Sequence, residues 1–408
     1  MKFITNVSEK EFSDFVINHE TSHFLKSYEW GQVSIYRKNT PYYVGVKKNG
    51  KLVATALLLQ KHLPLGYSYF YIPRGYTIDY NDYEVLEFFT KEIAKFTKSK
   101  KSIYFKIDPD IKLHKIDKDA KPIKDGENNY ELVKNLKKIG FKHQKLNLFF
   151  EGMQPRFTFR VDIKDDMDVI RKRYSKSVIR WVKKANKYNV ETFIGDKDNV
   201  DDFIELMKMT EKRQGFYSHV YVFYHNLYKV FSKKDYISVM LARINVKDVC
   251  KELEEEIEKA EDVSIKEKLI ARKEKYEELG KEKNERIVSS YINIHYGNKS
   301  WYLYGANDMD FKDTFANYKL FDYQIEKSNE LGLEIFDEFG TVGDPKTKKS
   351  VAGLHEFKQK FGGEYTEFIG EFDYITRPFI YIMYTKLVPL YRKPLLFFRH
   401  LKVKRNKI

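Results

Sequence analysis

The sequence contains almost no cysteine and no long apolar run. Cys250 is the one thiol among 408 residues, so the chain cannot form an internal disulfide framework or a cysteine-based zinc site. No stretch approaches the ~20 consecutive apolar residues of a membrane-spanning helix. The first fifteen residues carry acids early and lack the apolar centre of a secretion signal. These absences predict a protein of a reducing compartment, and we expect it to be cytoplasmic.

Several catalytic signatures are also missing. The sequence has no glycine-rich loop of the kind that opens a helix and holds the pyrophosphate of acyl-CoA. It has no strand-turn-helix serine elbow and no His/Cys cluster with the spacing of metal ligands. Cys250 lies in a segment with helical spacing, which is a poor position for a nucleophile. We therefore expect neither a metal nor a cofactor.

The composition is that of a folded, basic protein. Hydrophobic residues make up 42% of the chain and aromatic residues 16%, which favours buried cores over disorder. A chain of 408 residues is too long for one ordinary core, so two domains are expected. Lys and Arg number 74 against 59 Asp and Glu, a formal net charge of +15. Such a balance favours polyanionic partners such as nucleic acid, anionic lipid or a pyrophosphate-bearing substrate.

Strand and helix signals alternate along the chain. Alternating or β-branched runs predict strands at residues 42–46, 52–59, 68–72, 102–107, 146–150, 157–161, 236–243, 288–296, 300–304 and 365–369. Apolar spacing of three and four predicts helices at residues 9–18, 83–98, 130–139, 171–187, 201–213 and 311–331. Lys48-Asn49-Gly50 is typical of a hairpin turn. The pattern predicts an α/β (α+β) fold with mixed sheets.

A turn-rich link at residues 151–155 indicates a domain boundary. We expect a first domain at residues 1–154, completed by about residues 371–390, and a second at residues 155–370. Residues 246–286 contain two helical runs that predict an antiparallel coiled-coil hairpin inserted in the second domain. Ser264 and Glu267 have the spacing of a capping box at the start of its second helix. A spacer or dimerisation role for this arm and a role in binding a partner both remain open.

The most basic segment is residues 171–187, in which eight of 17 residues are Lys or Arg. As one helix it would carry a cationic face formed by Arg173, Lys176, Arg180, Lys184 and Lys187. Such a face could attract the phosphates of tRNA or lipid through sequence-independent electrostatics. It could equally be an ordinary solvated face.

The C-terminal tail has an unusual composition. Residues 374–408 contain no acid, nine Lys or Arg and many aromatic residues, interrupted by three prolines. This pattern is typical of a segment that lies at a membrane surface, with cations on anionic lipid. We expect peripheral membrane contact through the basic tail at residues 391–408. The alternative is a tail docked on the first domain.

Residues 353–363 form a compact motif between two predicted strands. Phe357 and Phe361 are four residues apart, so they share one helix face, and Gly362-Gly363 can turn the chain back into a strand. Lys358 then points elsewhere, and its ordinary interpretation is a solvated lysine.

This motif and five others, in the same order, resemble the Fem-type aminoacyltransferases (the group of FemA, FemB, FemX and MurM), which build interpeptide bridges in peptidoglycan precursors. The matching stretches are Ser27-Tyr28-Glu29-Trp30-Gly31, Tyr71-Ile72-Pro73-Arg74-Gly75, Ile107-Asp108-Pro109, Pro155-Arg156-Phe157-Thr158-Phe159, Tyr302-Leu303-Tyr304-Gly305-Ala306 and Gly353 to Gly370. The resemblance implies two GNAT-like acyltransferase domains, aminoacyl-tRNA as donor and co-substrate, and a cell-wall precursor as acceptor.

The resemblance also implies site residues. Lys358 would stabilise the oxyanion, and Asp108 would be a general base, although an Asp-Pro turn is an equal reading of that position. Phe357, Tyr304 and Trp30 would contact substrate, with Phe357 and Tyr304 in one channel. Phe223 and Tyr224 match an aromatic pair near the precursor's phosphates. His219 stands where the family usually has arginine, so phosphate contact there is in doubt and a structural histidine is an open alternative.

The function predicted on this basis is transfer of an amino acid from aminoacyl-tRNA to the stem-peptide amine of a peptidoglycan precursor, either lipid II or the UDP-linked muramyl pentapeptide. Two alternatives stay open. One is a related acyltransferase with another donor or acceptor, and the other is a non-catalytic relative that binds RNA or membrane.

Overall fold

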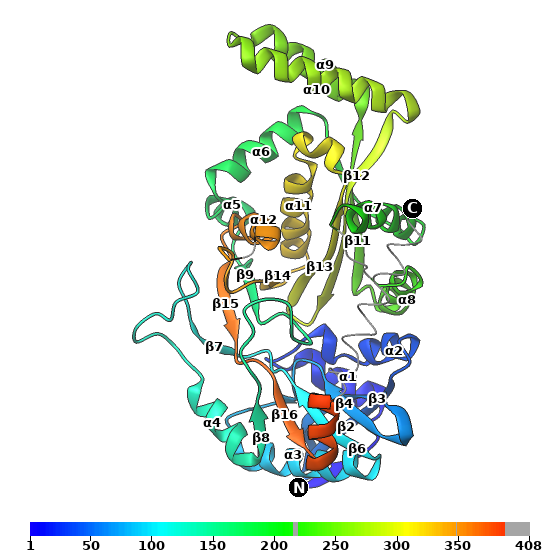
Figure 1. Cartoon of the computed structure of the whole chain (residues 1–408), viewed down its shortest axis with the longest axis vertical. Helices are drawn as coiled ribbons and strands as arrows, with labels where there is room; N and C mark the ends of the chain where they lie inside the picture. The colour runs from blue at the N-terminus through cyan, green and yellow to red at the C-terminus, as the bar shows by residue number, and fades with distance from the viewer. Residues whose placement is uncertain (215–218, 348, 388–408) are drawn as a thin grey trace.

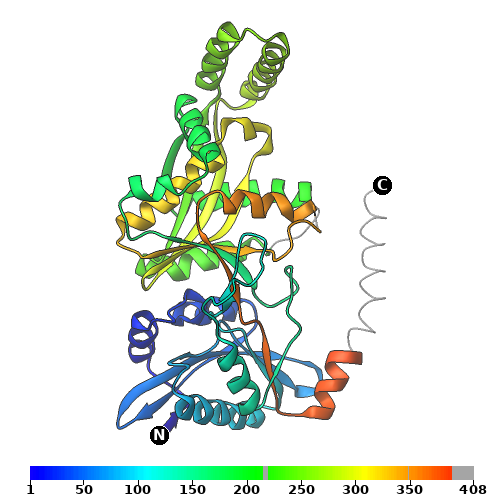
Figure 2. The same cartoon turned by 90° about the vertical axis from the view of Figure 1, so that its left-hand side faces the viewer.

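The structure is a computed structural model that describes residues 1–214, 219–347 and 349–387. Two eight-stranded mixed sheets lie one after the other along the long axis of the molecule (Figures 1 and 2). The first sheet has the order β1-β2-β3-β4-β6-β16-β8, with β5 paired to β3, and the second has the order β10-β11-β12-β13-β14-β9-β15-β7. The predicted α/β class with two mixed sheets is therefore confirmed.

The first sheet combines seven strands from the N-terminal part with one from the C-terminal part. Its strands are β1 (Lys2–Ile4), β2 (Thr40–Lys48), β3 (Lys51–His62), β4 (Ser68–Ile72), β5 (Thr77–Ile78), β6 (Ser102–Ile107), β8 (Phe141–His143) and β16 (Phe372–Ile375). The β2–β3 hairpin turns at Asn49 and Gly50, both with positive φ, as the Asn-Gly pair predicts. The helices of this part are α1 (Glu9–Asn18), α2 (Tyr28–Tyr36), α3 (Tyr83–Ser99) and α4 (Tyr130–Ile139).

The predicted strand at residues 146–150 is wrong. The last strand of this region in sequence is β8, and residues 146–150 form an irregular link in which Leu146, Leu148 and Phe150 are exposed. β16 arrives from the far end of the chain and pairs with both β6 and β8. The sheet therefore obtains its interior strand from the C-terminal region, and the local alternation at 146–150 does not form a strand.

The second sheet is covered by helices on both faces (Figure 1). Its strands are β7 (Lys112–Lys115), β9 (Phe157–Asp162), β10 (Glu191–Gly195), β11 (Ile237–Asn245), β12 (Glu285–Tyr296), β13 (Lys299–Asn307), β14 (Ile335–Thr341) and β15 (Glu364–Phe368). Its helices are α5 (Met167–Lys172), α6 (Lys176–Lys187), α7 (Asn199–Gln214), α8 (Val222–Phe231), α11 (Ala316–Glu330) and α12 (Lys349–Gln359).

Two predicted helices of this half differ from the structure. The basic segment at 171–187 is not one helix, because Ser175 caps a new helix by accepting a hydrogen bond from the Val178 amide. The helix predicted at 311–331 begins as a 3₁₀ turn, and α11 starts only after Phe315, whose φ is 57°. In both places, a local cap or turn interrupts a periodicity that would otherwise continue.

The predicted helical hairpin at residues 246–286 is confirmed as α9 (Val246–Lys259) and α10 (Val263–Glu282), at the top of Figure 1. The capping residue of α10 is Asp262, which accepts from the Ile265 amide, so the expected capping box at Ser264 is wrong. The base of the arm belongs to the core of the second half. Tyr276 is buried, with its ring centroid 4.9 Å from that of Phe311.

We expect the outer part of the arm to be dispensable for folding and its base to be required. Replacing residues 255–267 by a short glycine-containing turn should leave one cooperative thermal transition close to that of the intact chain, because hairpin connections of different lengths differ little in closure entropy. Removing residues 246–286 should lower the transition markedly, because the contact of Tyr276 with Phe311 is lost. If the outer deletion abolished the transition, the tip would be part of the core.

The two halves are joined by a shared apolar core and a buried ion-pair chain. Arg160 on β9 contacts Asp110, which follows β6, at 2.6 Å and Asp337 on β14 at 2.8 Å. The Arg160 charge holds the pKa of Asp110 well below its usual range, against the effect of burial. Because one cation contacts two buried carboxylates, its loss would leave both without their direct ion-pair partner.

Arg160→Met should therefore lower the free energy of unfolding by about 3–5 kcal/mol in urea denaturation. The matched control is Arg243→Met. Arg243 forms a solvent-exposed pair with Glu191, so the control should cost less than about 1 kcal/mol. Equal losses in the two variants would show that the Asp110–Arg160–Asp337 chain contributes no more than a surface pair.

Candidate active site

Lys358 lies on α12 with its ammonium group enclosed by backbone carbonyls. Only 3% of the residue is exposed, so the interpretation as a solvated lysine is wrong. Its Nζ donates to the carbonyl oxygens of Glu338, Phe339 and Gly340 at 2.5, 3.2 and 2.8 Å. The register of β14 against β9 shifts between Asp337 and Gly340, and Phe339 has a φ of 57°. This irregular turn of the strand presents three successive carbonyls to one cation.

A buried carboxyl group lies on the same turn. Glu338 is fully buried, and neither of its carboxylate oxygens has a hydrogen-bond partner among the described residues. Burial raises the Glu338 pKa well above its ordinary value, and the nearby Lys358 charge opposes that shift. Burial lowers the pKa of Lys358 to about 8. Sequence reasoning missed Glu338. Two acids between phenylalanines in the predicted strand, Phe336-Asp337-Glu338-Phe339, are unusual and could have indicated a buried acid.

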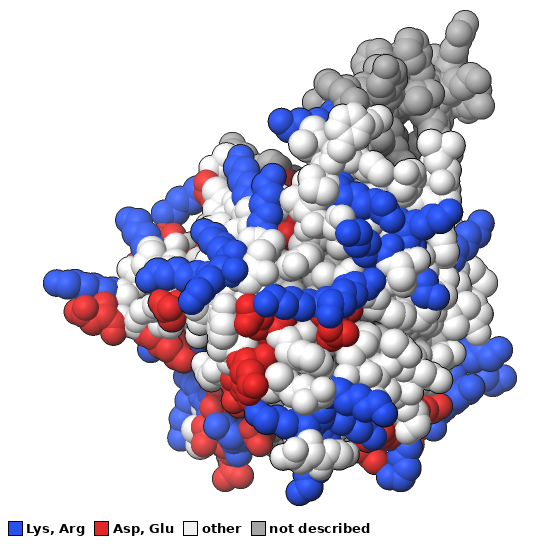
Figure 3. Space-filling model, turned by 90° about the horizontal axis from the view of Figure 1, so that it is seen from below, with Lys and Arg blue, Asp and Glu red and all other residues white. Residues whose placement is uncertain are grey.

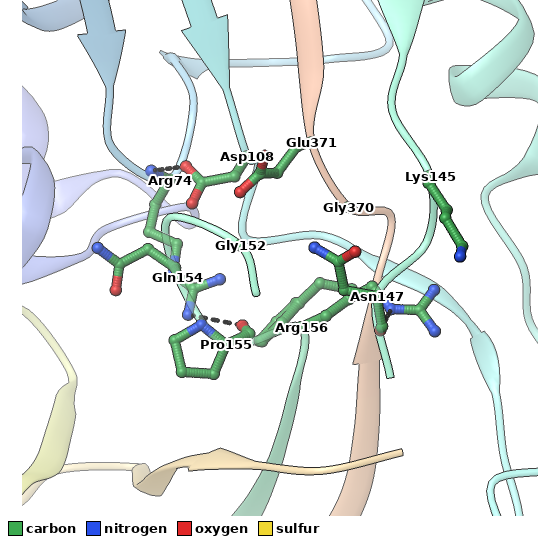
Figure 4. A pocket seen from close by; sticks show the side chains of 11 residues that line it. Arg74, Asp108, Lys145, Asn147, Gly152, Gln154, Pro155, Arg156, Gly370 and Glu371 are labelled. Carbon is green, nitrogen blue, oxygen red and sulfur yellow. Dashed lines mark hydrogen bonds between the residues drawn. The ribbon is translucent and has the colours of Figure 1, made fainter. Parts of the chain in front are cut away.

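Asp108 lies in a pocket between the two halves (Figure 4). Strands β4 and β6 run parallel, so their carboxyl ends reach the same edge and bring Arg74 and Asp108 together. The Asp108 carboxylate accepts from the Tyr71 hydroxyl at 2.9 Å and from the Arg74 amide at 2.7 Å. These partners are distant in sequence, so Asp108 is held by tertiary contacts and does more than form an Asp-Pro turn.

The Asp108 pocket is lined by charged and polar groups from several segments. Burial raises the pKa of Asp108 to about 7, with the Arg74 charge opposing and the Glu371 charge adding to the shift. The lining residues are Arg74, Asp108, Lys145, Asn147, Gly152, Gln154, Pro155, Arg156, Phe368, Gly370 and Glu371. A carboxyl group that titrates near neutrality in such a pocket can accept a proton from an amine.

The turn that holds Lys358 contacts the wall of this pocket. A Cβ added at Gly340 would lie 2.4 Å from Cγ of Pro155, so glycine allows the close approach. The Pro155 carbonyl in turn accepts from the Arg74 guanidinium at 3.4 Å. Lys358 itself does not line the pocket. The two residues predicted as catalytic are thus connected through Gly340, Pro155 and Arg74.

A separate aromatic cluster gathers four of the residues predicted to bind substrate. A hydrogen bond of 3.0 Å joins Nε2 of His219 and the Tyr304 hydroxyl. The His219 ring also packs on Phe223, with ring centroids 4.2 Å apart. Tyr224 lies 5.4 Å from Tyr304 by ring centroid. Burial lowers the pKa of His219 to about 4, so its imidazole is neutral near pH 7. This environment fits a structural histidine better than a phosphate-binding cation.

The other two predicted substrate contacts differ in position: Trp30 belongs to the same apolar core as Phe223 and Tyr224, whereas Phe357 packs in a different one. Phe357 packs on Tyr318 and Phe321, both 5.1 Å away by ring centroid, on the α11 side of the second sheet. It therefore packs in a different apolar cluster from Tyr304, and the shared channel stays a prediction. Trp30 is buried and packs edge-on against Phe24 at 5.7 Å.

Sequence reasoning also missed a cation beside the aromatic cluster. Arg37, which ends α2, lies with its guanidinium carbon 5.6 Å from the centroid of the Phe223 ring. It is an exposed residue from the first half that approaches a helix of the second half. Arg37 therefore supplies a permanent positive charge where His219 does not.

The predicted cationic face is divided by ion pairs. Three of its five members contact acids: Arg173 pairs with Asp165, Lys184 with Glu256 at 3.1 Å and Lys187 with Glu252 at 3.4 Å. The last two pairs dock α6 against the arm helix α9. Lys176 and Arg180 have no ion-pair partner within residues 1–214, 219–347 and 349–387. The basic tail at 391–408 lies outside the described residues.

Comparison with known proteins assigns the chain to a family. The FemAB family model matches residues 7–277 and 264–388, which together cover most of the sequence. The chain belongs to the FemAB family. Lipid II:glycine glycyltransferase of Staphylococcus epidermidis is 28% identical over 414 residues, covering 94% of this chain and 95% of that protein. The enzyme of the same name from Staphylococcus aureus is 28% identical over 417 residues, with 94% and 95% coverage.

Solved structures agree with this assignment. A crystal structure of FemX superposes with a TM-score of 0.78 at 25% identity, covering 94% of this chain and 99% of that one. L-PGS from Bacillus licheniformis shares the fold, with a TM-score of 0.50 at 10% identity and coverage of 94% and 97%. This FemAB protein is an aminoacyltransferase of peptidoglycan bridge formation, and it has the fold of FemX, with two mixed sheets and an inserted helical hairpin.

Within the part of the chain that the structure describes, no helix is long and apolar enough to cross a bilayer. Among the same residues, no group of three or more His, Cys, Asp or Glu side chains is arranged to hold a metal ion.

Proposed function

We propose that this FemAB-family enzyme transfers an amino acid from aminoacyl-tRNA to the stem-peptide amine of lipid II, in the cytoplasm and at the inner face of the membrane. The observation that carries the proposal is its similarity, over nearly the full length of both chains, to enzymes named lipid II:glycine glycyltransferase. Glycyl-tRNA is therefore the first donor to test. The proposed division at residues 154 and 370 would place the acceptor pocket at the junction of the two domains.

Asp108 is the base in this proposal. The acceptor amine is protonated in water and must lose a proton to attack the aminoacyl ester. The Asp108 carboxylate, with a pKa raised to about 7, would take that proton inside the pocket between the halves. The attack forms the new C–N bond and the ester C–O bond breaks. The terminal ribose oxygen of the tRNA leaves with the electron pair of that bond and takes up the second proton that the attacking nitrogen loses. No covalent enzyme intermediate is required.

Lys358 would stabilise the negative charge that develops on the ester carbonyl oxygen. An ammonium group has three N–H donors, and all three are directed at strand carbonyls in this structure. A direct hydrogen bond to the oxyanion would have to replace one of them, and the contact with the Phe339 carbonyl is the longest at 3.2 Å. Otherwise the lysine acts at a distance through its charge.

The remaining predicted residues have supporting roles in the proposal. Arg37 would contact the anionic part of the acceptor beside the aromatic cluster of His219, Phe223, Tyr224 and Tyr304. Lys176 and Arg180 would attract the tRNA backbone. Trp30 and Phe357 would shape the site from within the cores.

The test is reconstituted transfer with purified enzyme, tRNA charged with glycine, alanine or serine, and either lipid II or the UDP-linked muramyl pentapeptide. Transfer to lipid II from one charged tRNA, with little transfer to the UDP-linked precursor, is the expected result. Preference for the UDP-linked precursor would overturn the lipid-linked acceptor. Absence of transfer to either acceptor from any charged tRNA, by an enzyme that still binds tRNA, would favour the non-catalytic alternative.

A further inference from the structure

One end of the molecule exposes several large apolar side chains to solvent. The loop between β3 and β4 carries Leu65 at its tip, with 91% of the residue exposed and a φ of 58°. Left-handed backbone is disfavoured for a residue with a Cβ, and an exposed leucine gains no stabilisation from burial of its side chain. The loop itself is closed by a hydrogen bond from the Leu63 amide to the Tyr67 carbonyl, 2.8 Å long. Neither the turn geometry nor the core accounts for leucine at this position.

A second segment at the same end also exposes apolar side chains. Residues 378–387 form α13 (Pro378–Ile382) and a following π-helical turn (Met383–Leu387). Phe379, Ile382 and Met383 share one helix face at spacings of three and four, and that face points to solvent, with Phe379 76% exposed. The opposite face carries Tyr381, which is buried against Tyr104.

Aromatic contacts join the loop and the helix into one surface. The ring of Tyr69, just after the loop, lies 5.2 Å from that of Tyr104 and 6.1 Å from that of Tyr384 by ring centroid. The Ser68 amide donates to the Lys101 carbonyl at 3.2 Å, which places the residues just before β6 beside the loop. Leu65, Phe379, Ile382 and Met383 therefore project from neighbouring segments, and we call these four residues the apolar rim.

The segments that carry the apolar rim contain cations and no acids. Residues 61–69, 98–104 and 374–387 include Lys61, Lys98, Lys100, Lys101, Arg377 and Lys386, and none of their residues is Asp or Glu. Lys142 also lies here, 5.7 Å from the Tyr381 ring. Figure 3 views this end of the molecule, and the part of the surface next to the grey residues is white and blue with little red. Exposed apolar side chains bordered by cations without acids complement an anionic lipid surface.

We propose that the apolar rim, Leu65, Phe379, Ile382 and Met383, inserts into the headgroup region of an anionic bilayer while the surrounding lysines and arginines contact lipid phosphates. This surface consists of described residues and is distinct from the tail at 391–408. The two are adjacent in sequence, because residues 388–408 continue from the helix with seven more Lys or Arg and no acid. In Figure 2, α13 is the orange-red helix at the side of the first half, and the arm of α9 and α10 lies at the opposite end of the molecule, so docking through this surface leaves the arm away from the contact.

The test is co-sedimentation of the full chain with vesicles of phosphatidylcholine alone or of phosphatidylcholine with phosphatidylglycerol, without substrates. The variant replaces the apolar rim by serine: Leu65→Ser, Phe379→Ser, Ile382→Ser and Met383→Ser. Because these side chains are exposed, thermal unfolding should be unchanged. Partitioning onto anionic vesicles should fall at least about tenfold. The control, Val263→Ser with Ile265→Ser, changes exposed apolar residues on the arm and should bind as the intact chain does.

A chain ending at Leu387 completes the test. It should still bind anionic vesicles, and the four serines should abolish that binding. Three outcomes would overturn the proposal: no binding of the intact chain to anionic vesicles, equal binding of the serine variant, or loss of all binding in the chain ending at Leu387. Vesicle binding is measured without transfer, so the proposal can fail while the transfer activity stands. Detergent-solubilised lipid II should be used equally by the intact chain and the serine variant.

Discussion

Lys358→Met should reduce turnover by roughly 10²–10³-fold, the usual effect of losing one oxyanion-stabilising group. Donor and acceptor affinity should change much less than the rate, since the charge is needed only when the ester carbonyl becomes negative. The measurement is single-turnover transfer from charged tRNA to lipid II, with the two affinities determined separately. Lys358→Arg should not retain the normal rate, because three carbonyls converge on a compact ammonium and a planar fork does not fit them.

The burial of Lys358 also changes what this substitution does to folding. Methionine removes the side-chain donor to the carbonyls of Glu338 and Gly340, while the Phe339 carbonyl keeps the Thr158 hydroxyl at 3.0 Å, so we expect a measurable loss of stability. Lys360→Met is the matched control, because Lys360 is only two residues away but packs its ammonium over the Trp181 ring. Assays must be run below the unfolding midpoint of each variant. Near-normal turnover of folded Lys358→Met would show that the lysine is structural.

Asp108→Asn should lower the rate of transfer by about 10²–10⁴-fold and remove the acid limb of its pH profile. In the intact enzyme, the rate should rise with pH through about 7 as Asp108 loses its proton. It should fall again above about 8 as Lys358 loses its charge. The resulting bell shape reports both groups, and Lys358→Met should remove only its alkaline side.

Tyr71→Phe distinguishes a base from a purely structural aspartate, because only a base would shift the acid limb of the pH profile. The Tyr71 hydroxyl donates to the Asp108 carboxylate and so favours the ionised form. Its removal should raise the pKa of Asp108 and move the acid limb to higher pH while the alkaline limb stays in place. An acid limb that remains unchanged in both Asp108→Asn and Tyr71→Phe would mean that another group is the base.

The same pKa predicts a stability effect of Asp108→Asn. The pKa of Asp108 is raised in the folded protein, from an ordinary value of 3.8 to about 7, so the folded state binds a proton more tightly than the unfolded state. Stability from this group is therefore lost as pH rises from about 4 to about 7. Asparagine cannot ionise, so the variant does not lose this contribution. The free energy of unfolding of the variant minus that of the intact chain should therefore be more favourable at pH 8 than at pH 4.

Local signals in the sequence were enough to predict most of the elements. The Asn49-Gly50 turn, the helix at residues 9–18 and the helical arm depend on neighbours in sequence, and the structure confirms them. The environment of Lys358 could not be predicted in this way. Its burial depends on an irregular turn of β14 that presents three carbonyls, and neither Glu338 nor Arg37 belongs to a motif.

Tertiary competition explains the other differences. The alternation at residues 146–150 is a genuine strand pattern, but β16 pairs with both β6 and β8 and the segment becomes a wall of the Asp108 pocket. Similarly, the helical period of residues 171–187 is real, yet Ser175 can cap a helix and does so. Long-range strand pairing therefore overrides the local pattern at residues 146–150, and a local cap interrupts the helical period at residues 171–187.

The position of β16 has a consequence for synthesis of this protein on the ribosome. β16 lies between β6 and β8, so the first sheet lacks an interior strand until residues 372–375 have been translated. Domains usually fold in order as they emerge, N-terminal first. Here the N-terminal sheet must wait for nearly the whole chain, with the edges of β6 and β8 unpaired in the meantime. Nascent chains that stall before residue 372 should therefore be held by chaperones or aggregate through those edges.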